Sequence, residues 1–388
     1  MARGDKPYRV YRGGRARGKA PLQPSRGRIL EQDGRRDGRP TKPKRRWGLG
    51  RWLAFLLFVL LAVAVTWGAL GFVAVRKGVR AANARLDPEV RAVLTPQDGL
   101  LLSQPTTILL LGTDHANTDE RVTFRRSDSI LLVRTDPEKH RIVYLSIPRD
   151  LKAEIPGHGD AKINAAFQLG GPALAARTVK RFTGLEINHV AIVDFGSFEQ
   201  LIDALGGITV DVPAPILSNR FDCPYSAERC AGWQGWRFEQ GPQRMDGRRA
   251  LVYSRIRENR LNPSESDVTR GERQQRVLQA LASELTSPRT LARMPFVGAE
   301  LLRPLATDLT AGEFAQLAWV KFRAPEERAL HCRLGGSATN IGGQAYIVST
   351  QENFAVIQMV TGRSAPQPPP PGSGPFGPGC VIGSRTIR

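Results

Sequence analysis

The sequence predicts an α/β protein, a sandwich of helices on both sides of a mainly β-sheet core, preceded by one transmembrane helix. Three observations indicate this fold class. Short apolar runs typical of buried strands alternate with helix-like segments between residues 105 and 325. One uncharged apolar run, residues 52–75, is long enough to cross a bilayer, and most of the basic charge lies ahead of that run. With 388 residues and 41% hydrophobic content, the chain can also build a sizeable core.

Residues 1–51 form a basic tail. They include seventeen Lys and Arg against four Asp and Glu, so the tail carries thirteen of the chain's twenty net positive charges. Its few apolar residues cannot bury enough surface to offset the entropy of ordering, and we expect it to be disordered. The tail could bind DNA weakly through phosphates, but it contains no motif that reads bases, so we expect no specific nucleic-acid partner.

The apolar run WLAFLLFVLLAVAVTWGALGFVAV, residues 52–75, predicts a single transmembrane helix. A secretory signal peptide is the less favoured alternative, because its apolar core is usually ~7–15 residues long and is followed by a small-residue cleavage site. By the positive-inside rule the basic tail stays in the cytoplasm, in contact with anionic lipid, and everything after Arg76 lies outside the cell membrane. Residues 76–104 are expected to form a linker or stem.

Four cysteines lie in the part of the chain that is expected to be extracytoplasmic and therefore oxidising. Cys223 and Cys230 frame the short loop CPYSAERC, which favours a local disulfide and leaves Cys332 and Cys380 to pair. A zinc site is the alternative, but the spacing does not fit zinc ligands and no histidine stands beside them.

The predicted strands and helices alternate along residues 105–325. The apolar runs that predict buried strands are TTILLLG, DSILLVRT, RIVYLSIP, HVAIVDF and GITVDV. The segments that predict helices between them include GPALAARTVKRFTG and GSFEQLIDALGG. Beyond residue 325 the sequence predicts only a C-terminal extension, residues 326–388, with the Pro-rich and Gly-rich tract APQPPPPGSGPFGPG.

Polar residues stand where several predicted strands end. Asp114 follows ILLLGT and Asp128 opens DSILLV, and carboxylates at strand ends could share a cation such as Mg²⁺; the alternative is that each caps a turn or a helix. SIPRD adds Arg149 at another strand end. KINAAF adds Lys162 and Asn164 at the start of a predicted helix, where a surface ion pair or a cap is the alternative.

The stretch LVYSRIRENRLNPSESDVTRGERQQRVLQAL, residues 251–281, concentrates arginines. LVYSRIR alternates, which predicts a strand with Tyr253, Arg255 and Arg257 on one face. A helix that begins near Val268 would place Arg270 and Gln274 one turn apart at its polar start, followed by an apolar face.

This arrangement of arginines favours a phosphate or diphosphate ligand that carries an apolar tail. The guanidinium group is suited to two-pronged phosphate recognition, and a helix N-terminus adds free N–H groups. The alternative for Arg255 is an ion pair with a neighbouring carboxylate such as Glu258 or Asp267.

Seven motifs, in this order and behind a membrane helix, resemble the LytR-CpsA-Psr family of cell-wall glycopolymer ligases. They are GTD, RSDSILL, SIPRD, KINAAF, DALGGITVDV, MDGRRALVYSRIR and DVTRGERQQ. The resemblance covers about residues 105–285 and implies an extracytoplasmic catalytic domain, assigned to residues 105–325. Such a domain transfers a glycopolymer phosphate from a polyprenyl-pyrophosphate carrier to peptidoglycan, with Mg²⁺ at the pyrophosphate.

The resemblance also implies roles for individual residues. Asp114 and Asp128 become the Mg²⁺ ligands, with Asp119 as an alternative because the segment between them is longer than the family pattern. Arg149 and Asp128 become the catalytic residues. The residues implied to contact the pyrophosphate are Arg149, Arg255, Arg257, Arg270 and Gln274.

The expected mechanism is direct in-line transfer, since no Ser, His and Asp constellation or nucleophilic Cys stands out in the sequence. Hydrolysis of the lipid pyrophosphate is a related side activity. Two other functions remain open: a protein that binds polyprenyl phosphates without catalysis, which would not require the paired aspartates, and a membrane-anchored transcriptional regulator that uses the basic tail.

Overall fold

The structure of the protein is a computed structural model that describes residues 48–113, 127–263, 267–373 and 376–383. The side chains of Asp128, Asp267 and Val268 lie outside this description. The chain divides into two compact units, residues 1–56 and 57–388, and the fold below is that of the second unit. The tail that is expected to be disordered lies outside the described residues up to residue 47.

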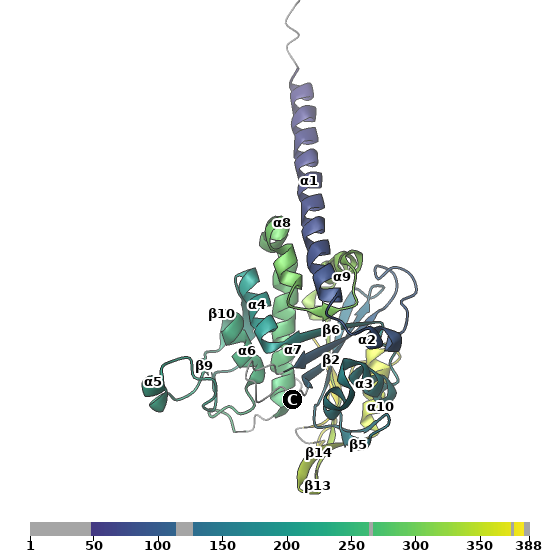
Figure 1. Ribbon diagram of the computed structural model, residues 1–388, viewed down its shortest axis with the longest axis vertical. Helices are drawn as coiled ribbons and strands as arrows, with labels where there is room; N and C mark the ends of the chain where they lie inside the picture. The colour runs from purple at the N-terminus through teal and green to yellow at the C-terminus, as the bar shows by residue number, and fades with distance from the viewer. Residues whose placement is uncertain (1–47, 114–126, 264–266, 374–375, 384–388) are drawn as a thin grey trace, which may run out of the picture. The chain divides into compact units, whose positions relative to one another are not determined.

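A mixed seven-stranded sheet forms the centre of the second unit (Figure 1). In sheet order its strands are β11 (Ala306–Thr307), β6 (His189–Asp194), β1 (Thr107–Thr113), β2 (Ser127–Asp136), β3 (Arg141–Ile147), β12 (Leu330–Arg333) and β15 (Gly379–Ile382). β1 runs parallel to β6, and β3 runs parallel to β12. The other neighbours in the sheet are antiparallel.

The helices and the remaining strands surround this sheet. The helices are α1 (Leu49–Asn83), α2 (Pro88–Val93), α3 (Ala165–Thr183), α4 (Phe195–Leu205), α5 (Ala227–Ala231), α6 (Gly247–Arg255), α7 (Asp267–Leu285), α8 (Pro288–Leu302), α9 (Ala311–Arg323) and α10 (Glu352–Val360). The strand pairs outside the sheet are β4 (Lys152–Ile155) with β5 (Gly159–Lys162), β7 (Ile208–Val212) with β10 (Gly241–Met245), β8 (Ile216–Leu217) with β9 (Arg237–Phe238), and β13 (Gly336–Ile341) with β14 (Gln344–Ser349).

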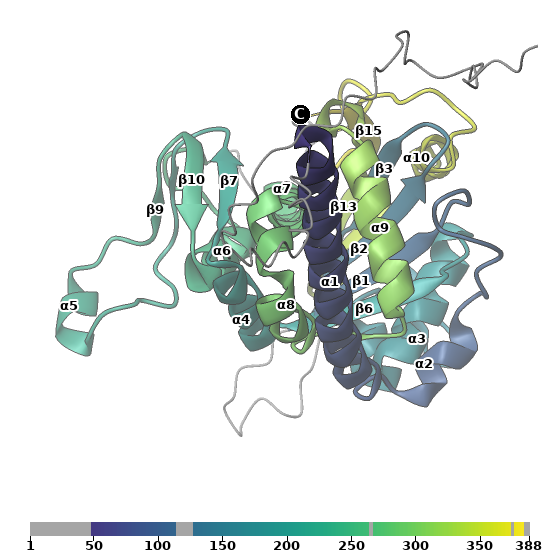
Figure 2. The same ribbon diagram turned by 90° about the horizontal axis from the view of Figure 1, so that it is seen from above.

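Helices cover both faces of the central sheet, as Figure 2 shows. On one face, Leu109 and Leu145 pack with residues of α3 and α10. On the other face, Ile142 and Tyr144 pack with Leu278 of α7 and with residues at the end of α9. The predicted sandwich of helices around a β-sheet core is therefore confirmed. A second core forms where α4, α6, α7 and α8 pack together with β7 and β10.

Most of the predicted elements are present. The five predicted strands are β1, β2, β3, β6 and β7, and the two predicted helices are α3 and α4. β7 pairs with β10 outside the central sheet, which the alternation of apolar residues alone could not indicate. α3 is kinked at Gly170 and Gly171, whose backbone angles are not helical.

The prediction of a strand at LVYSRIR is wrong, because residues 251–255 lie in helix α6. Asp246 caps this helix, accepting a hydrogen bond from the backbone N of Arg249 at 2.7 Å. Leu251 through Ser254 are all buried, so the segment has no exposed face to alternate with a buried one. Seven residues are too few for periodicity to separate a buried helix from a strand. As a result Arg255 ends the helix and Arg257 follows it, and the two do not share a strand face.

The C-terminal segment belongs to the central sheet and is not an appendage. β12 and β15 extend the sheet beyond β3, with Cys332 opposite Cys380 in their register. The disulfide Cys332–Cys380 joins these two strands, and Cys223–Cys230 closes the short loop before and within α5. Both predicted disulfides are confirmed. The expected boundary at residue 325 thus divides a continuous sheet.

Residues 76–104, expected to form a linker, are packed against the domain. α1 continues to Asn83, and Val79 and Ala82 near its end are buried. α2 follows after Asp87, which caps it, and Val90 is completely buried. Within the described residues, α1 is the one helix long and apolar enough to span a membrane, and it includes the predicted span 52–75.

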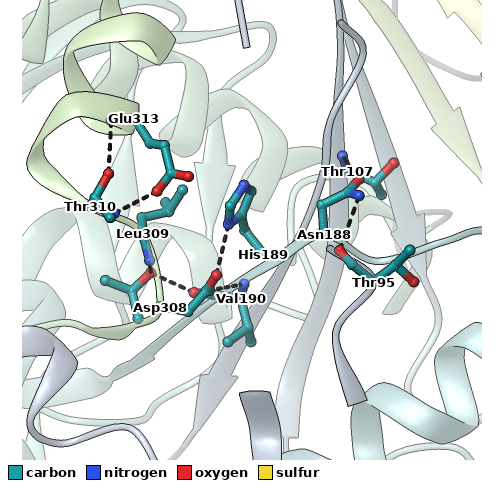
Figure 3. Close-up of polar contacts among 10 residues, drawn as sticks. Thr95, Thr107, Asn188, His189, Val190, Asp308, Leu309, Thr310 and Glu313 are labelled. Atoms are coloured by element: carbon teal, nitrogen blue, oxygen red, sulfur yellow. Dashed lines mark hydrogen bonds and ion pairs between the residues drawn. The ribbon is translucent and has the colours of Figure 1, made fainter. Parts of the chain in front are cut away.

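Polar contacts fix the edge of the sheet that carries β6 and β11 (Figure 3). Asp308 accepts a hydrogen bond from the backbone N of Val190 and lies 2.7 Å from Nδ1 of His189. Two residues later, Thr310 and Glu313 form a capping box at the start of α9. These contacts join α9 firmly to the strand that lies beside β1.

Candidate functional site

A cavity of about 440 Å³ opens between the sheet and helices α4, α6 and α7. Most of its wall is apolar. The apolar side chains that line it are Leu110, Leu111, Leu131, Val193, Phe195, Phe198, Phe221, Leu251, Val277 and Leu278. They come from β1, β2, β6, α4, α6 and α7 and from the loop before α5, so the cavity depends on the tertiary fold rather than on any one element. A wall of this composition suits a hydrocarbon chain.

The same cavity has a cationic part. Arg255, Arg257, Arg270 and Gln274 all line it, so the structure brings four of the five expected pyrophosphate contacts to one cavity. Arg149, the fifth, lines a neighbouring cavity instead. An enclosure that combines an apolar wall with several guanidinium groups fits an amphiphilic anion.

Arg255 is held at the cavity by three neighbours. Its guanidinium group forms an ion pair with Asp222 and lies 4.7 Å from the ring centre of Phe195 and 5.7 Å from that of Phe221. Among the described residues the expected partner Glu258 instead accepts a hydrogen bond from Asn219. The carboxylate that pairs with Arg255 is therefore that of Asp222, which lies farther away in the sequence than the expected partners. The aromatic faces fix the plane of the guanidinium group.

Arg270 and Gln274 form the wall between two cavities. They lie one turn apart on α7, as predicted, and both line the large cavity and a second cavity of about 170 Å³. Gln274 accepts a hydrogen bond from Oγ of Ser129 on β2 at 2.9 Å. Between them, Gly271 lets α7 approach β3, since a Cβ there would lie 2.7 Å from Oγ of Ser146. The glycine of the TRGERQQ motif therefore brings the arginine close to the sheet.

The second cavity contains Arg149 together with Asp150 and Tyr346. Nε of Arg149 lies 3.4 Å from Asp150, whose carboxylate also accepts a hydrogen bond from Lys162 at 2.8 Å. Burial acts to raise the pKa of Asp150, but the Lys162 hydrogen bond and the charges of Arg149, Lys162 and Arg270 outweigh it and lower the pKa below its usual value. Asp150 is therefore ionised and orients Arg149.

The KINAAF motif supports the same turn. Lys162 joins Asp150 and lies 5.5 Å from the ring centre of Tyr346. The backbone N of Asn164 donates to the carbonyl of Arg149 at 3.3 Å, and Asn164 begins α3 without a side-chain cap. These two residues hold the SIPRD turn, which explains why the two motifs occur together.

Arg333 is a functional candidate that the sequence reasoning missed. It lines the second cavity, is 5% exposed, and donates to the carbonyl of Gly377 at 2.8 and 3.2 Å. Burial lowers its pKa, which the nearby carboxylate of Glu272 partly offsets. It lies on β12, beyond the segment that carries the motifs, so no local signal could have indicated it. Asp222, Phe195 and Phe221 were missed for a similar reason, because only the tertiary fold brings them to Arg255.

The side chains of the expected metal ligands lie outside the described part of the chain. Asp114 and Asp119 lie outside the described residues, and so does the side chain of Asp128. In the strands beside them, Thr113 pairs with Ser127, and the register shifts after Gly112. Within the described ranges no group of three or more His, Cys, Asp or Glu could hold a metal ion.

A mixed sheet beside an apolar cavity that several arginines line is a fold and site suited to an amphiphilic anion. The LytR-CpsA-Psr family profile matches residues 77–360, and the chain belongs to this family. The match is wider than the resemblance in the motifs and includes β12 and α10.

Two relatives illustrate the similarity. The polyisoprenyl-teichoic acid–peptidoglycan teichoic acid transferase TagU of Oceanobacillus iheyensis is 30% identical over 267 residues, which are 67% of this chain and 76% of TagU. The regulatory protein MsrR of Staphylococcus aureus is 34% identical over 205 residues, 52% of this chain and 56% of MsrR.

Solved structures show the same fold. TagV of Bacillus subtilis superposes with a TM-score of 0.56 at 26% identity, over 67% of this chain and 97% of TagV. TagT bound to LIIa-WTA superposes with a TM-score of 0.53 at 25% identity, over 69% of this chain and 93% of TagT.

Proposed function

We propose that this protein is a phosphotransferase that attaches a glycopolymer from a polyprenyl-pyrophosphate carrier to peptidoglycan. The observation that carries the proposal is the large cavity, whose apolar wall fits a polyprenyl chain and whose arginines fit a pyrophosphate. The relative TagU, a polyisoprenyl-teichoic acid–peptidoglycan teichoic acid transferase, and the fold neighbour TagT bound to LIIa-WTA support the same class of substrate. The glycopolymer itself is not specified by the cavity.

The reaction follows from where charge develops. An acceptor hydroxyl of peptidoglycan attacks the phosphorus next to the glycan; a new O–P bond forms, and the bond from this phosphorus to the bridging oxygen breaks. The lipid leaves as a monophosphate, and the hydroxyl proton passes to a base. Arg255, Arg257 and Arg270 offset the negative charge that grows on the phosphoryl oxygens and on the departing phosphate. Arg149 approaches the same group from the second cavity.

Mg²⁺ is part of the proposal. Asp114 and Asp128 would hold it, because carboxylate oxygens suit this ion. A bound Mg²⁺ would supply further positive charge to the pyrophosphate. Pyrophosphate hydrolysis is a side activity that would follow if water replaced the acceptor hydroxyl.

We place the protein in the cell membrane as a single-pass protein. The basic tail before residue 52 favours a cytoplasmic N-terminus, with the catalytic domain outside. Two disulfides agree with an oxidising compartment. A phosphatase reporter that works only outside the cytoplasm should therefore be active when it is fused to the C-terminus. Activity of a cytoplasm-specific reporter at the same position would refute this topology.

The deciding experiment uses full-length protein in proteoliposomes. It is incubated with lipid-linked glycan, a peptidoglycan oligomer and Mg²⁺, and the joined product is quantified. If Asp128→Asn abolishes transfer but still binds the lipid, the result supports an enzymatic function that requires Asp128. Binding of the lipid-linked glycan without any joined product would favour a non-catalytic polyprenyl-phosphate binding protein.

A further inference from the structure

Helix α8 packs along the part of α1 that includes residues 67–78. Nε1 of Trp67 donates to the carbonyl of Ala292 at 3.0 Å, and the rings of Trp67 and Phe296 meet edge to face at 5.6 Å. The backbones approach closely, because a Cβ at Gly78 would lie 2.6 Å from the carbonyl O of Ala299. Figures 1 and 2 both show α8 beside this part of α1. Because the contacts advance from Ala292 to Ala299 as α1 advances from Trp67 to Gly78, the two helices run in the same direction and pack closely.

Residues 288–298 of α8 expose a surface that is unusual for a water-facing helix. Phe296 is 73% exposed and Leu291 is 51% exposed. Arg289 and Arg293 are exposed on the same half of the helix, and residues 288–299 contain no acidic side chain. Apolar side chains interspersed with arginines are typical of helices that lie in a membrane interface, where the arginines meet lipid phosphates.

The contacts with α1 set the level of this surface relative to a bilayer. About 20 residues cross the hydrocarbon core, so a span that begins at Trp52 ends near Gly71. A Cβ at Gly71 would lie 3.4 Å from the side chain of Met294, and Trp67 contacts the same turn of α8. Tryptophan is also enriched at membrane interfaces. The start of α8 therefore lies where the predicted span leaves the hydrocarbon.

We infer that residues 288–298 of α8, which run alongside α1, contact the outer leaflet and insert Leu291 and Phe296 into it. Arg289 and Arg293 then bind the phosphate groups of the lipids. The inference rests on the proposed membrane position of α1. It goes further because it assigns a second, non-spanning lipid contact to the folded domain.

The contact of α8 with the membrane is linked to the large cavity through the core that α8 shares with α4. Met294 and Val297 of α8 pack in the core that also contains Leu201 and Phe198 of α4. Phe198 lines the large cavity. Insertion of α8 thus fixes one wall of the cavity relative to the bilayer that contains the polyprenyl carrier.

The test measures membrane depth at single sites of the full-length protein in lipid nanodiscs that contain anionic lipid. Phe296→Cys and Leu291→Cys are each spin-labelled, and Phe354→Cys on α10, where Phe354 is 71% exposed, is the matched control. All four native cysteines are in disulfides and do not take the label. Collisions with oxygen, which concentrates in the bilayer, are compared with collisions with a water-soluble nickel chelate.

We expect labels at 296 and 291 to favour oxygen over nickel, consistent with a depth of about 5–10 Å, and the label at 354 to favour nickel. Nickel accessibility at 296 and 291 equal to that at 354 would overturn the inference. Extraction of the protein from native membranes at alkaline pH tests the transmembrane position of α1 separately from the lipid contact of α8. An extractable protein refutes the membrane helix and this inference together, whereas a resistant protein with water-exposed labels refutes this inference alone.

Discussion

The two cavities share a wall but differ in size and in the residues that form the rest of their lining. In the small cavity, Arg149 faces Asp150, and Arg333 lies 3.8 Å from Glu272. In the large cavity, apolar side chains form most of the wall, and Arg255, which also lines it, pairs with Asp222. Under the proposed function, the large cavity would take the long amphiphile and the small one would hold Arg149 in place. The following variants test that division.

The largest loss is expected at the shared wall. Arg270 is 7% exposed and lines both cavities. Arg270→Ala should reduce glycan transfer about 100-fold or more, because each charge-assisted hydrogen bond that it removes contributes ~1.5–3 kcal/mol. The transfer rate is measured in proteoliposomes beside the thermal unfolding temperature.

Arg276→Ala provides the control for Arg270→Ala. Arg276 lies on the same helix, pairs with Glu272 at 3.8 Å, and lines neither cavity. Its substitution should change stability but leave the transfer rate of the folded protein close to that of the wild type. Equal losses of transfer in both variants would show that the losses come from disruption of helix α7 rather than from a lost contact with the ligand.

A smaller loss is expected at Arg255. Arg255→Lys keeps the charge but loses the planar two-pronged donor and its contact with Phe195. One charge-assisted hydrogen bond of ~1.5–3 kcal/mol corresponds to about a tenfold or larger loss of transfer, and Arg255→Ala should be worse. Arg249→Lys is matched to it, because Arg249 lies on the same helix, 4.4 Å from the ring centre of Phe238, and lines neither cavity.

Arg255→Lys distinguishes a role of Arg255 in pyrophosphate binding from a role only in the ion pair with Asp222. If Arg255 serves only that pair, a lysine should replace it with little effect, since exposed ion pairs contribute ~0–1 kcal/mol. An Arg255→Lys protein as stable and as active as Arg249→Lys would therefore remove Arg255 from the pyrophosphate site.

The apolar part of the large cavity can be tested with a change in volume. Leu110→Phe adds a ring to the wall from the central strand β1. The KM for a long polyprenyl carrier should rise several-fold with little change in kcat, because the chain loses space while the charged head keeps its contacts. Carriers with short chains should be affected less. An equal rise in KM for short and long carriers would mean that the chain lies elsewhere.

The residues of the site differ in how far the sequence alone could predict their positions. Arg270 and Gln274 were predictable, because a helix start and a spacing of one turn are local properties. The position of Arg255 at a helix end was not, since a segment of seven residues that is mostly buried fits either periodicity. Arg333 and Asp222 reach the site only through β12 and the disulfide loop, and pairings over such sequence distances leave no local pattern. The fold itself was predictable from the strand runs, although the membership of β12 and β15 in the sheet was not.

The smallest effect on transfer is expected in the small cavity, at Asp150. Because its pKa is lowered in the folded protein, ionised Asp150 stabilises the fold above the ordinary value of 3.8, and this contribution is lost as the pH falls through the lower folded pKa. Asp150→Asn should therefore be less stable than the wild type at pH 7, by about 1 kcal/mol since solvent screens the pair. The difference should shrink as the pH falls below 4. Denaturant unfolding at several pH values measures it.

The same variant separates a positioning role from a purely structural one. Asp150 orients Arg149, so Asp150→Asn should lower kcat a few-fold while the KM for the lipid carrier, set by the large cavity, stays nearly constant. Asp136→Asn removes a carboxylate that is comparably exposed and pairs with Arg141 at 3.2 Å, outside both cavities. If the two variants lose stability alike and neither changes kcat, the small cavity does not position Arg149 for transfer. A fall in kcat confined to Asp150→Asn would instead show that the small cavity positions Arg149 for transfer.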